Sequence, residues 1–209
     1  EPSGDKLGAE LMAGLKSCSP YELDFCGVGG FLMEEQGLTS LFPISEIAVM
    51  GIGEILAKYS FLKKRIKNTV DDILRHKPDV LITIDAPEFS LRVAKMVRKK
   101  LFINTIHYVA PTVWAWRPNR AKKISGYVDH ILALFPFEPP YMQREGISCD
   151  FVGHPVANEN LPEPSLVKKF RQQHKIGEND TLVAFLPGSR ISEVDRLMPV
   201  FKNVSSLLI

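Results

Sequence analysis

The sequence predicts an α/β protein built on a parallel sheet, and three observations support this fold class. The 209-residue chain is 45% hydrophobic and 24% charged, which is typical of a packed globular protein. Short apolar runs rich in branched side chains recur along it, as expected of strands buried on both faces. Stretches with helical periodicity separate these runs, and strands that alternate with helices form a parallel sheet covered on both faces.

The N-terminal part of the chain is predicted to be mainly helical. An amphipathic helix is expected over residues 4–16, with Ser3 or Asp5 as its N-cap, and a less clear strand over 22–28. A second amphipathic stretch lies within residues 48–67, where lysines occupy much of the polar face. Its apolar stripe consists of Ile52, Ile55, Leu56, Tyr59, Leu62 and Ile66. Such a stripe belongs either to the protein core or to a helix lying on an anionic membrane surface.

Four buried strands are predicted in the rest of the chain. They are expected at residues 79–85, 102–109, 130–135 and 181–187. Helical periodicity follows the first of them at 89–100 and precedes the last at 165–175. In open parallel sheets, ligands bind beyond the carboxyl ends of the strands. The candidate binding loops are therefore those that begin at Asp85, His107, Pro136 and Pro187.

Charge and cysteine content exclude several classes of protein. The formal net charge of +2 does not call for a nucleic-acid partner. Cys18, Cys26 and Cys149 fit no zinc or redox motif, and their odd number argues against a disulfide framework, so a reducing compartment is the simplest interpretation.

No apolar run approaches the roughly 20 residues of a membrane-spanning helix. The sequence also carries no signal-peptide pattern.

Asp85 is the first candidate for chemistry, because it ends the predicted strand at 79–85. A carboxylate at the mouth of a parallel sheet is partly desolvated and can act as a general base. The alternative is that Asp85 caps a helix beginning near Pro87, and the two interpretations are equally supported by the spacing. Glu88, the second carboxylate of this loop, is adequately explained by a position in the first turn of that helix.

The segment 186–194, LPGSRISEV, is the second candidate site. It predicts a strand end, a turn and a helix start, where backbone N–H groups attract phosphate and Arg190 can bind it bidentately. Glu193 is placed for a capping box with Ser189 or Arg190, and an ordinary capped helix is the alternative. The segment lacks the lysine and the spacing of a P-loop. GVGG at 27–30 lacks the full dinucleotide fingerprint and is interpreted as a tight turn that needs bare backbone.

Together these segments resemble lipid-A-disaccharide synthases, which are inverting glycosyltransferases with a two-domain B-type fold. The matching segments run the length of the chain in the family's order. They are EPSGDKLGAEL (1–11), GVGGFLMEEQGL (27–38), AVMGIGEIL (48–56), PDVLITIDAPEFS (78–90), IHYVAPTVWAWRPNR (106–120), LALFPFE (132–138), FVGHPVAN (151–158) and LPGSRISEV (186–194). The tryptophan segment and the strand ending in IDAP are the most specific. Two departures from the family pattern are Asn158 in place of aspartate and EFS in place of DFN after IDAP.

The resemblance implies a domain organisation. Residues 1–157 are expected to form a Rossmann-like N-terminal acceptor domain without its first strand, followed by a linker at 158–178. Residues 179–209 are expected to be the truncated start of a C-terminal domain that binds the nucleotide sugar. Both ends of the chain look like cuts through a longer protein.

The resemblance also implies a reaction. The donor is UDP-2,3-diacylglucosamine, and the acceptor is 2,3-diacylglucosamine 1-phosphate. The 6-hydroxyl of the acceptor attacks the anomeric carbon of the donor, forms a β-1′,6 linkage and releases UDP. Asp85 is then the candidate base, and Arg190 is placed to stabilise the departing diphosphate. The resemblance implies no metal and no cofactor.

The same resemblance suggests which residues bind the substrates. Trp114 and Trp116 can supply an apolar wall for an acylated sugar, while Arg117 or Arg120 supplies a cation for its phosphate. The alternative is that one tryptophan belongs to the core and that the arginines are solvated. The other expected substrate contacts are Ser3, Gly4, Asp5, His107, Arg190 and Glu193.

Since such substrates reside in a membrane, part of the stripe on residues 48–67 becomes a candidate for membrane contact. The residues expected there are Ile52, Ile55, Leu56, Tyr59 and Leu62. The expected location is the cytoplasmic side of the inner membrane of a Gram-negative bacterium, with peripheral attachment. The alternative function is that of a catalytically inactive fragment or remnant that at most binds a lipid or a membrane surface.

Overall fold

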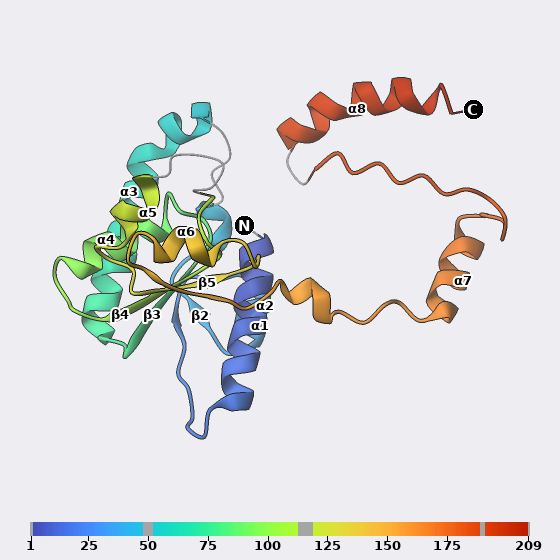
Figure 1. The fold of residues 1–209 in the computed structure, drawn as a ribbon. Coiled ribbons are helices and arrows are strands. Elements are labelled where there is room, and N and C mark those ends of the chain that lie inside the picture. Colours follow the sequence, from blue (N-terminus) through green and yellow to red (C-terminus); the bar gives the residue numbers. More distant parts are fainter. Residues whose placement is uncertain (1, 48–51, 113–118, 189–190, 209) are drawn as a thin grey trace. The chain divides into compact units, whose positions relative to one another are not determined.

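The computed structural model describes residues 2–47, 52–112, 119–188 and 191–208 (Figure 1). The side chains of residues 2, 52–58, 119–120, 158 and 192 lie outside this description. The chain forms two compact units, Glu1–Asn158 and Glu159–Ile209. The sequence-based boundary between the acceptor domain and the linker lies between residues 157 and 158. The two units are described one after the other.

The first unit alternates helices and strands. In chain order its elements are α1 (Pro2–Cys18), β1 (Cys26–Gly27), α2 (Phe31–Glu35), β2 (Thr39–Ser40), a 3-10 turn (Ile44–Glu46), α3 (Ile52–His76), β3 (Val80–Ile84), α4 (Ser90–Arg98), β4 (Asn104–Tyr108), α5 (Asn119–Ile124), β5 (His130–Ala133), α6 (Pro139–Gln143), β6 (Ser148–Phe151) and a second 3-10 turn (Pro155–Asn158).

The main sheet is parallel, with the strand order β3-β4-β5-β6. Ile84 lies opposite Tyr108, and Tyr108 lies opposite Leu132. This register brings the carboxyl ends of β3, β4 and β5 to the same edge of the sheet (Figure 1). The short strands β1 and β2 form a separate parallel pair. The predicted α/β class with a parallel sheet is confirmed.

Two clusters of buried side chains hold the helices against the sheet. The first joins α3 and α4 to the start of β3 and includes Val70, Ile73 and Val97. The second joins α5 and α6 to β5 and includes Ile124, Ile131 and Met142. Burying one such side chain stabilises the fold by roughly 1.5–3 kcal/mol. By packing the helices against the sheet, these clusters fix the strands whose carboxyl ends carry the candidate loops.

The boundaries of two helices differ from those that the sequence predicts. α1 begins at Pro2, so Ser3 and Asp5 lie inside its first turn and the prediction that one of them is its N-cap is wrong. α3 continues beyond residue 67 to His76, because its apolar stripe continues through Val70 and Ile73 into the core.

The strand predicted at 22–28 is shorter than expected, because Cys26 and Gly27 alone find strand partners, Thr39 and Ser40 of β2. The short elements β2, α2, α5 and α6 did not emerge from the sequence pattern, since none is long enough to show a period.

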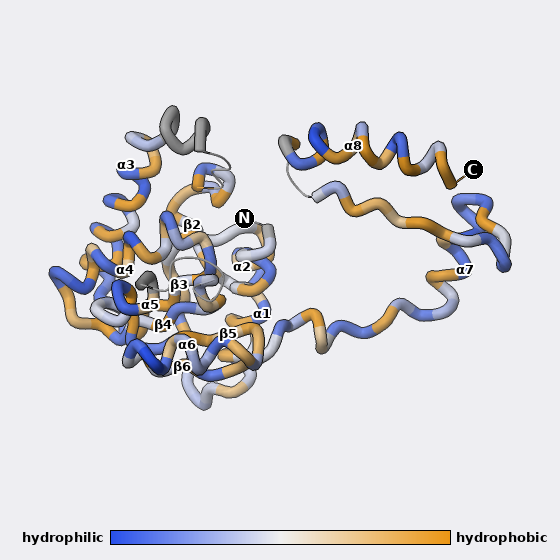
Figure 2. Tube along the Cα trace, turned by 45° about the horizontal axis from the view of Figure 1, so that its top comes forward, coloured by the Kyte–Doolittle hydropathy of each residue, from blue (hydrophilic) through white to orange (hydrophobic). Residues whose placement is uncertain are grey.

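The second unit contains α7 (Pro164–Gln173) and α8 (Ile191–Ser205). Residues 181–187 do not form the predicted buried strand, and that prediction is wrong for this structure. A strand requires a neighbour for its backbone N–H and C=O groups, and this segment pairs with no strand among the described residues. Its hydrophobic side chains remain largely exposed. Figure 2 shows this hydrophobic stretch in orange before α8. Phe185 does contact Phe201 of α8, with ring centroids 4.9 Å apart.

Candidate functional site

Asp85 lies where β3 ends and is half-buried. Its backbone N–H donates to the carbonyl of Tyr108 at 2.9 Å, which ties the loop to the neighbouring strand. Its carboxylate makes no hydrogen bond or ion pair with the residues that the structure describes. α4 begins at Ser90, and its N-cap position is held by Phe89. The alternative interpretation of Asp85 as the cap of this helix is therefore wrong.

Backbone strain is concentrated at this edge of the sheet. Asp85 and Ala86 both have φ of 42°, and Val109, at the end of β4, has φ of 79°. Non-glycine residues in this left-handed region cost roughly 1–3 kcal/mol each and occur disproportionately at functional sites. The N–H of Val109 donates to the carbonyl of Leu132 at 3.0 Å, so the strand ladder holds the strained loop in place.

The start of α1 lies at the same edge. Leu7, in its second turn, shares a buried cluster with Tyr108 and Leu134, which lie at the carboxyl ends of β4 and β5. Ser3 is exposed and Gly4 is half-buried, and both lie in the first turn of α1, ahead of Leu7.

The carboxylate of Asp5 is used inside the protein. It is buried and accepts hydrogen bonds from the backbone N–H groups of Gly30 at 2.8 Å, Leu32 at 3.0 Å and Met33 at 3.2 Å. A Cβ at Gly30 would lie 2.5 Å from this carboxylate, so only glycine fits. In the GVGG segment the backbone of Gly30 thus lies directly against Asp5, and this contact holds the start of α2. In this structure Asp5 positions this loop, and its contact with substrate stays a prediction.

His107 of β4 is also an internal residue. Its side chain is 1% exposed, and its Nδ1 lies 2.8 Å from Oγ1 of Thr83 on β3. A ring at this depth is not presented to solvent in this structure, and the substrate contact of His107 stays a prediction. The neighbouring Tyr108 is buried as well. Burial, and then the charge of Glu10, raise the pKa of its phenol, which therefore stays protonated at neutral pH.

The loop after β5 is one of the candidate binding loops, and it contains Glu138, a buried acid that the sequence analysis did not single out. Glu138 is buried, and its Oε2 accepts the backbone N–H of Phe135 at 2.9 Å, while its own N–H donates to the carbonyl of Phe135 at 3.2 Å. The rings of Phe135 and Phe137 stack with centroids 5.5 Å apart and an interplanar angle of 8°. Burial, and then the charges of Glu138 and Asp150, raise the pKa of the nearby Cys149 thiol to about 11. An acid placed between aromatic residues and prolines directly after a strand is the signal that could have indicated Glu138.

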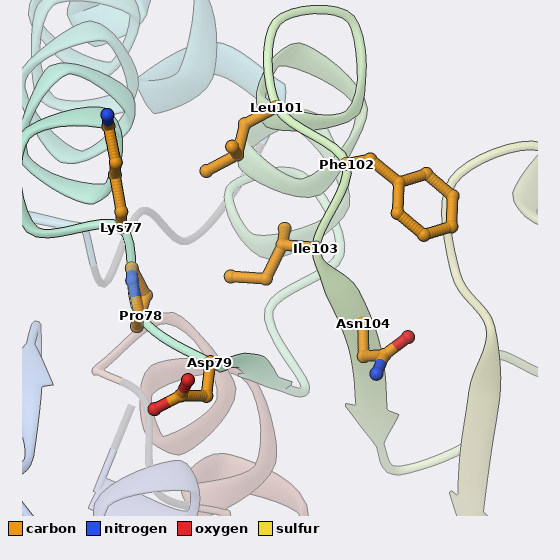
Figure 3. Close-up of a pocket in the computed structure, with 7 residues that line it drawn as sticks. All are labelled: Lys77, Pro78, Asp79, Leu101, Phe102, Ile103 and Asn104. Carbon is orange, nitrogen blue, oxygen red and sulfur yellow. The ribbon is translucent and has the colours of Figure 1, made fainter.

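A pocket of about 290 Å³ lies at the opposite, amino edge of β3 and β4 (Figure 3). Its lining residues are Lys77, Pro78, Asp79, Leu101, Phe102, Ile103 and Asn104. Ligands of open parallel sheets bind at the carboxyl edge, so this pocket is not the candidate site. Among the described residues, no group of three or more His, Cys, Asp or Glu side chains is arranged to hold a metal ion.

Comparison with known proteins identifies the family of this chain. A family model described as lipid-A-disaccharide synthetase matches residues 1–208. The chain belongs to the lipid-A-disaccharide synthetase family. A lipid-A-disaccharide synthase of Ruegeria pomeroyi is 54% identical over 201 residues, which are 96% of this chain and 50% of the relative. One of Rhodospirillum centenum is 48% identical over 209 residues, 100% of this chain and 52% of the relative.

A more distant relative, the probable mitochondrial lipid-A-disaccharide synthase of Arabidopsis thaliana, is 37% identical over 228 residues, 100% of this chain and 49% of the relative. The chain thus spans about half the length of the curated relatives that it matches.

Several family residues that the sequence proposed lie outside the described structure. Trp114, Trp116, Arg117 and Arg190 are outside the described residues, and Arg120 belongs to α5 with its side chain outside the description. Glu193 lies in the first turn of α8, and a Cβ at Gly188 would collide with its carboxylate. Glu193 therefore folds back over the turn that precedes the helix, as a capping residue does.

The apolar stripe of α3 divides between core and surface in this member of the lipid-A-disaccharide synthetase family. Leu62 is 4% exposed and packs in the core, so this structure does not present it to a membrane. Tyr59 is exposed, with the guanidinium of Arg92 5.8 Å from its ring centroid. The side chains of Ile52, Ile55 and Leu56 lie outside the description. None of the described helices combines the length and the apolar character that spanning a bilayer requires.

Replacing Glu138 with alanine is expected to lower the free energy of unfolding by about 1–3 kcal/mol, because the part-buried N–H of Phe135 loses its acceptor. Glu138→Gln should cost less, since the amide oxygen can still accept this hydrogen bond. Urea denaturation followed by circular dichroism measures both variants. Equal stabilities for the two would contradict the role assigned to the carboxylate.

Proposed function

We propose that this chain is the acceptor-side half of a lipid-A-disaccharide synthase. The enzyme would join UDP-2,3-diacylglucosamine to 2,3-diacylglucosamine 1-phosphate. The observation that carries this proposal is the half-buried Asp85 carboxylate at the strained carboxyl end of β3, which makes no hydrogen bond or ion pair with a described residue. Membership of the lipid-A-disaccharide synthetase family supports the choice of substrates.

In the proposed reaction, the 6-hydroxyl oxygen of the acceptor attacks the anomeric carbon of the donor and inverts its configuration. The bond between that carbon and the diphosphate breaks, and UDP leaves with the electron pair. Asp85 takes the proton of the attacking hydroxyl, an assistance that is typically worth roughly 10²–10⁴ in rate. Arg190 would stabilise the negative charge of the departing diphosphate.

Substrate contacts are proposed at the same edge. Ser3 and Gly4 would lie against the acceptor sugar, since they begin a helix that packs beside the strand ends. Trp114 and Trp116 would line the acylated part, and Arg117 or Arg120 would bind the 1-phosphate. Glu193 and Arg190 would contact the donor. The exposed Tyr59 and the apolar residues Ile52, Ile55 and Leu56 would rest on the cytoplasmic surface of the inner membrane of a Gram-negative bacterium.

A second function is favoured by the exposed apolar side chains of residues 181–187, which lack strand partners among the described residues. A chain with this feature could bind a lipid surface without catalysing transfer. We propose on the same ground that the 209-residue chain alone turns over little or no substrate.

The test compares this chain with an extended chain, in which the flanking segments of the Ruegeria pomeroyi relative supply the remaining length. Both are incubated with UDP-diacylglucosamine and diacylglucosamine 1-phosphate, and disaccharide and UDP are quantified. The expected result is transfer by the extended chain and little or none by the 209-residue chain. No product from a folded extended chain would refute the glycosyltransferase proposal. Comparable rates from both would refute the proposed inactivity of the shorter one.

A further inference from the structure

Two half-exposed phenylalanines stand directly beyond the carboxyl end of β5. Phe135 is 45% exposed and Phe137 is 46% exposed, although both are large apolar side chains. Their rings are stacked nearly parallel, so the pair presents a continuous apolar surface. Exposed aromatic pairs of this kind carry a hydration cost that a bound apolar group removes.

The pair is held rigidly. The Glu138 carboxylate accepts the N–H of Phe135, and a reciprocal backbone hydrogen bond from the N–H of Glu138 closes the turn between them. The N–H of Tyr141 then donates to the carbonyl of Glu138 at 3.1 Å, which joins the turn to α6. A preorganised surface loses little conformational entropy on binding, and this favours a ligand-binding role over a mobile surface loop.

Two further exposed apolar side chains lie at the carboxyl end of the neighbouring strand β6. Phe151, at the end of β6, lies opposite Ala133, and the N–H of Val152 donates to the carbonyl of Ala133 at 2.9 Å. Phe151 and Val152 are both about half exposed. On the other side of β5, the carbonyl of Leu132 accepts the N–H of Val109, which lies at the end of β4. β4 is in turn the neighbour of β3, the strand that Asp85 follows.

The chemistry of the loop indicates which part of a substrate it would contact. Between Phe135 and Pro140, Glu138 is the only residue with a polar side chain, and it is buried and bonded to the loop backbone. A sugar ring needs hydrogen-bonding side chains for its hydroxyls, and this segment offers none to a ligand. A hydrocarbon chain needs only apolar surface.

We infer that Phe135 and Phe137, continued by Phe151 and Val152, form the subsite for a fatty acyl chain of the sugar substrate. This inference rests on the proposed function, which places the acceptor at the carboxyl edge. Each methylene buried against such a surface strengthens binding severalfold. The subsite would therefore make affinity depend on acyl-chain length, while Asp85 acts on the sugar.

The extended chain offers a direct test by calorimetric titration. Its affinity is measured for two diacylglucosamine 1-phosphates, one with butyryl and one with octanoyl chains. Wild type is expected to bind the octanoyl compound at least ten times more tightly, and the Phe135→Ser, Phe137→Ser double variant to lose most of this preference. Phe102→Ser is the matched control, because Phe102 is 82% exposed at the amino edge of the sheet and should keep the preference (Figure 3).

Thermal denaturation verifies that the variants remain folded, which is expected because both replaced side chains are half exposed. A chain-length preference that persists in the double variant, or that wild type lacks, overturns the subsite. Transfer activity is measured in parallel to separate the two proposals. If wild type binds with the predicted preference but forms no disaccharide, the proposed reaction fails and the acyl subsite stands.

Discussion

Replacing Asp85 with asparagine is expected to lower the rate of glycosyl transfer by the extended chain by roughly 10²–10⁴. The amide has nearly the same shape as the carboxylate but cannot accept the proton of the attacking hydroxyl. The carboxylate makes no hydrogen bond with a described residue, so the substitution should leave the fold and the melting temperature unchanged. Steady-state kinetics with both lipid substrates measures the effect, which should appear in kcat more than in KM.

Glu88→Gln is the matched control for this experiment. Glu88 belongs to the same loop, is exposed, and pairs with Arg92 at 2.5 Å. Exposed ion pairs contribute about 0–1 kcal/mol, so this variant should be as active and nearly as stable as wild type. Near-normal transfer by Asp85→Asn, or an equal loss in both variants, would remove Asp85 from the role of base.

Replacing Asp5 with alanine is expected to destabilise the first unit by roughly 3–5 kcal/mol. Three backbone N–H groups, those of Gly30, Leu32 and Met33, lose a charged acceptor in a buried setting. The start of α2 and the turn before it would lose their attachment to α1. Urea denaturation monitored by circular dichroism gives the change in the free energy of unfolding.

Two further variants separate the hydrogen bonds of Asp5 from a general effect of removing an acidic residue. Asp5→Asn keeps one acceptor oxygen, so its loss of stability should be smaller than that of Asp5→Ala. Glu35→Ala removes an exposed carboxylate from α2 and should change stability by less than about 0.5 kcal/mol. If Asp5→Ala were as stable as Glu35→Ala, the internal role of Asp5 would be wrong.

The elements that the sequence predicts correctly are those whose pattern is local. β3, β4 and β5 are short apolar runs bounded by turn residues, and α1 and α4 have a clear helical period. The stretch 181–187 has the same apolar pattern as β3 but no strand partner among the described residues. Pattern shows that a segment is suited to a sheet, whereas pairing depends on segments elsewhere in the chain.

The candidate site was partly predictable for the same reason. Asp85 could be placed at the sheet edge from the strand that precedes it, but its capping alternative was excluded only by the observed start of α4 at Ser90. The internal partners of Asp5 and His107 lie far along the chain, at Gly30 and Thr83. Sequence spacing does not reveal such contacts, so the sequence predicts substrate contacts for both residues and misses their internal hydrogen bonds.

A crystal structure of the extended chain with diacylglucosamine 1-phosphate would test most directly whether the carboxyl edge of the sheet is where the sugar is activated. We expect the 6-hydroxyl of the sugar to lie about 2.6–3.2 Å from the carboxylate of Asp85, beside the start of α1. A sugar bound at the amino-edge pocket, or one whose 6-hydroxyl contacts another base while Asp85 points away, would contradict this assignment.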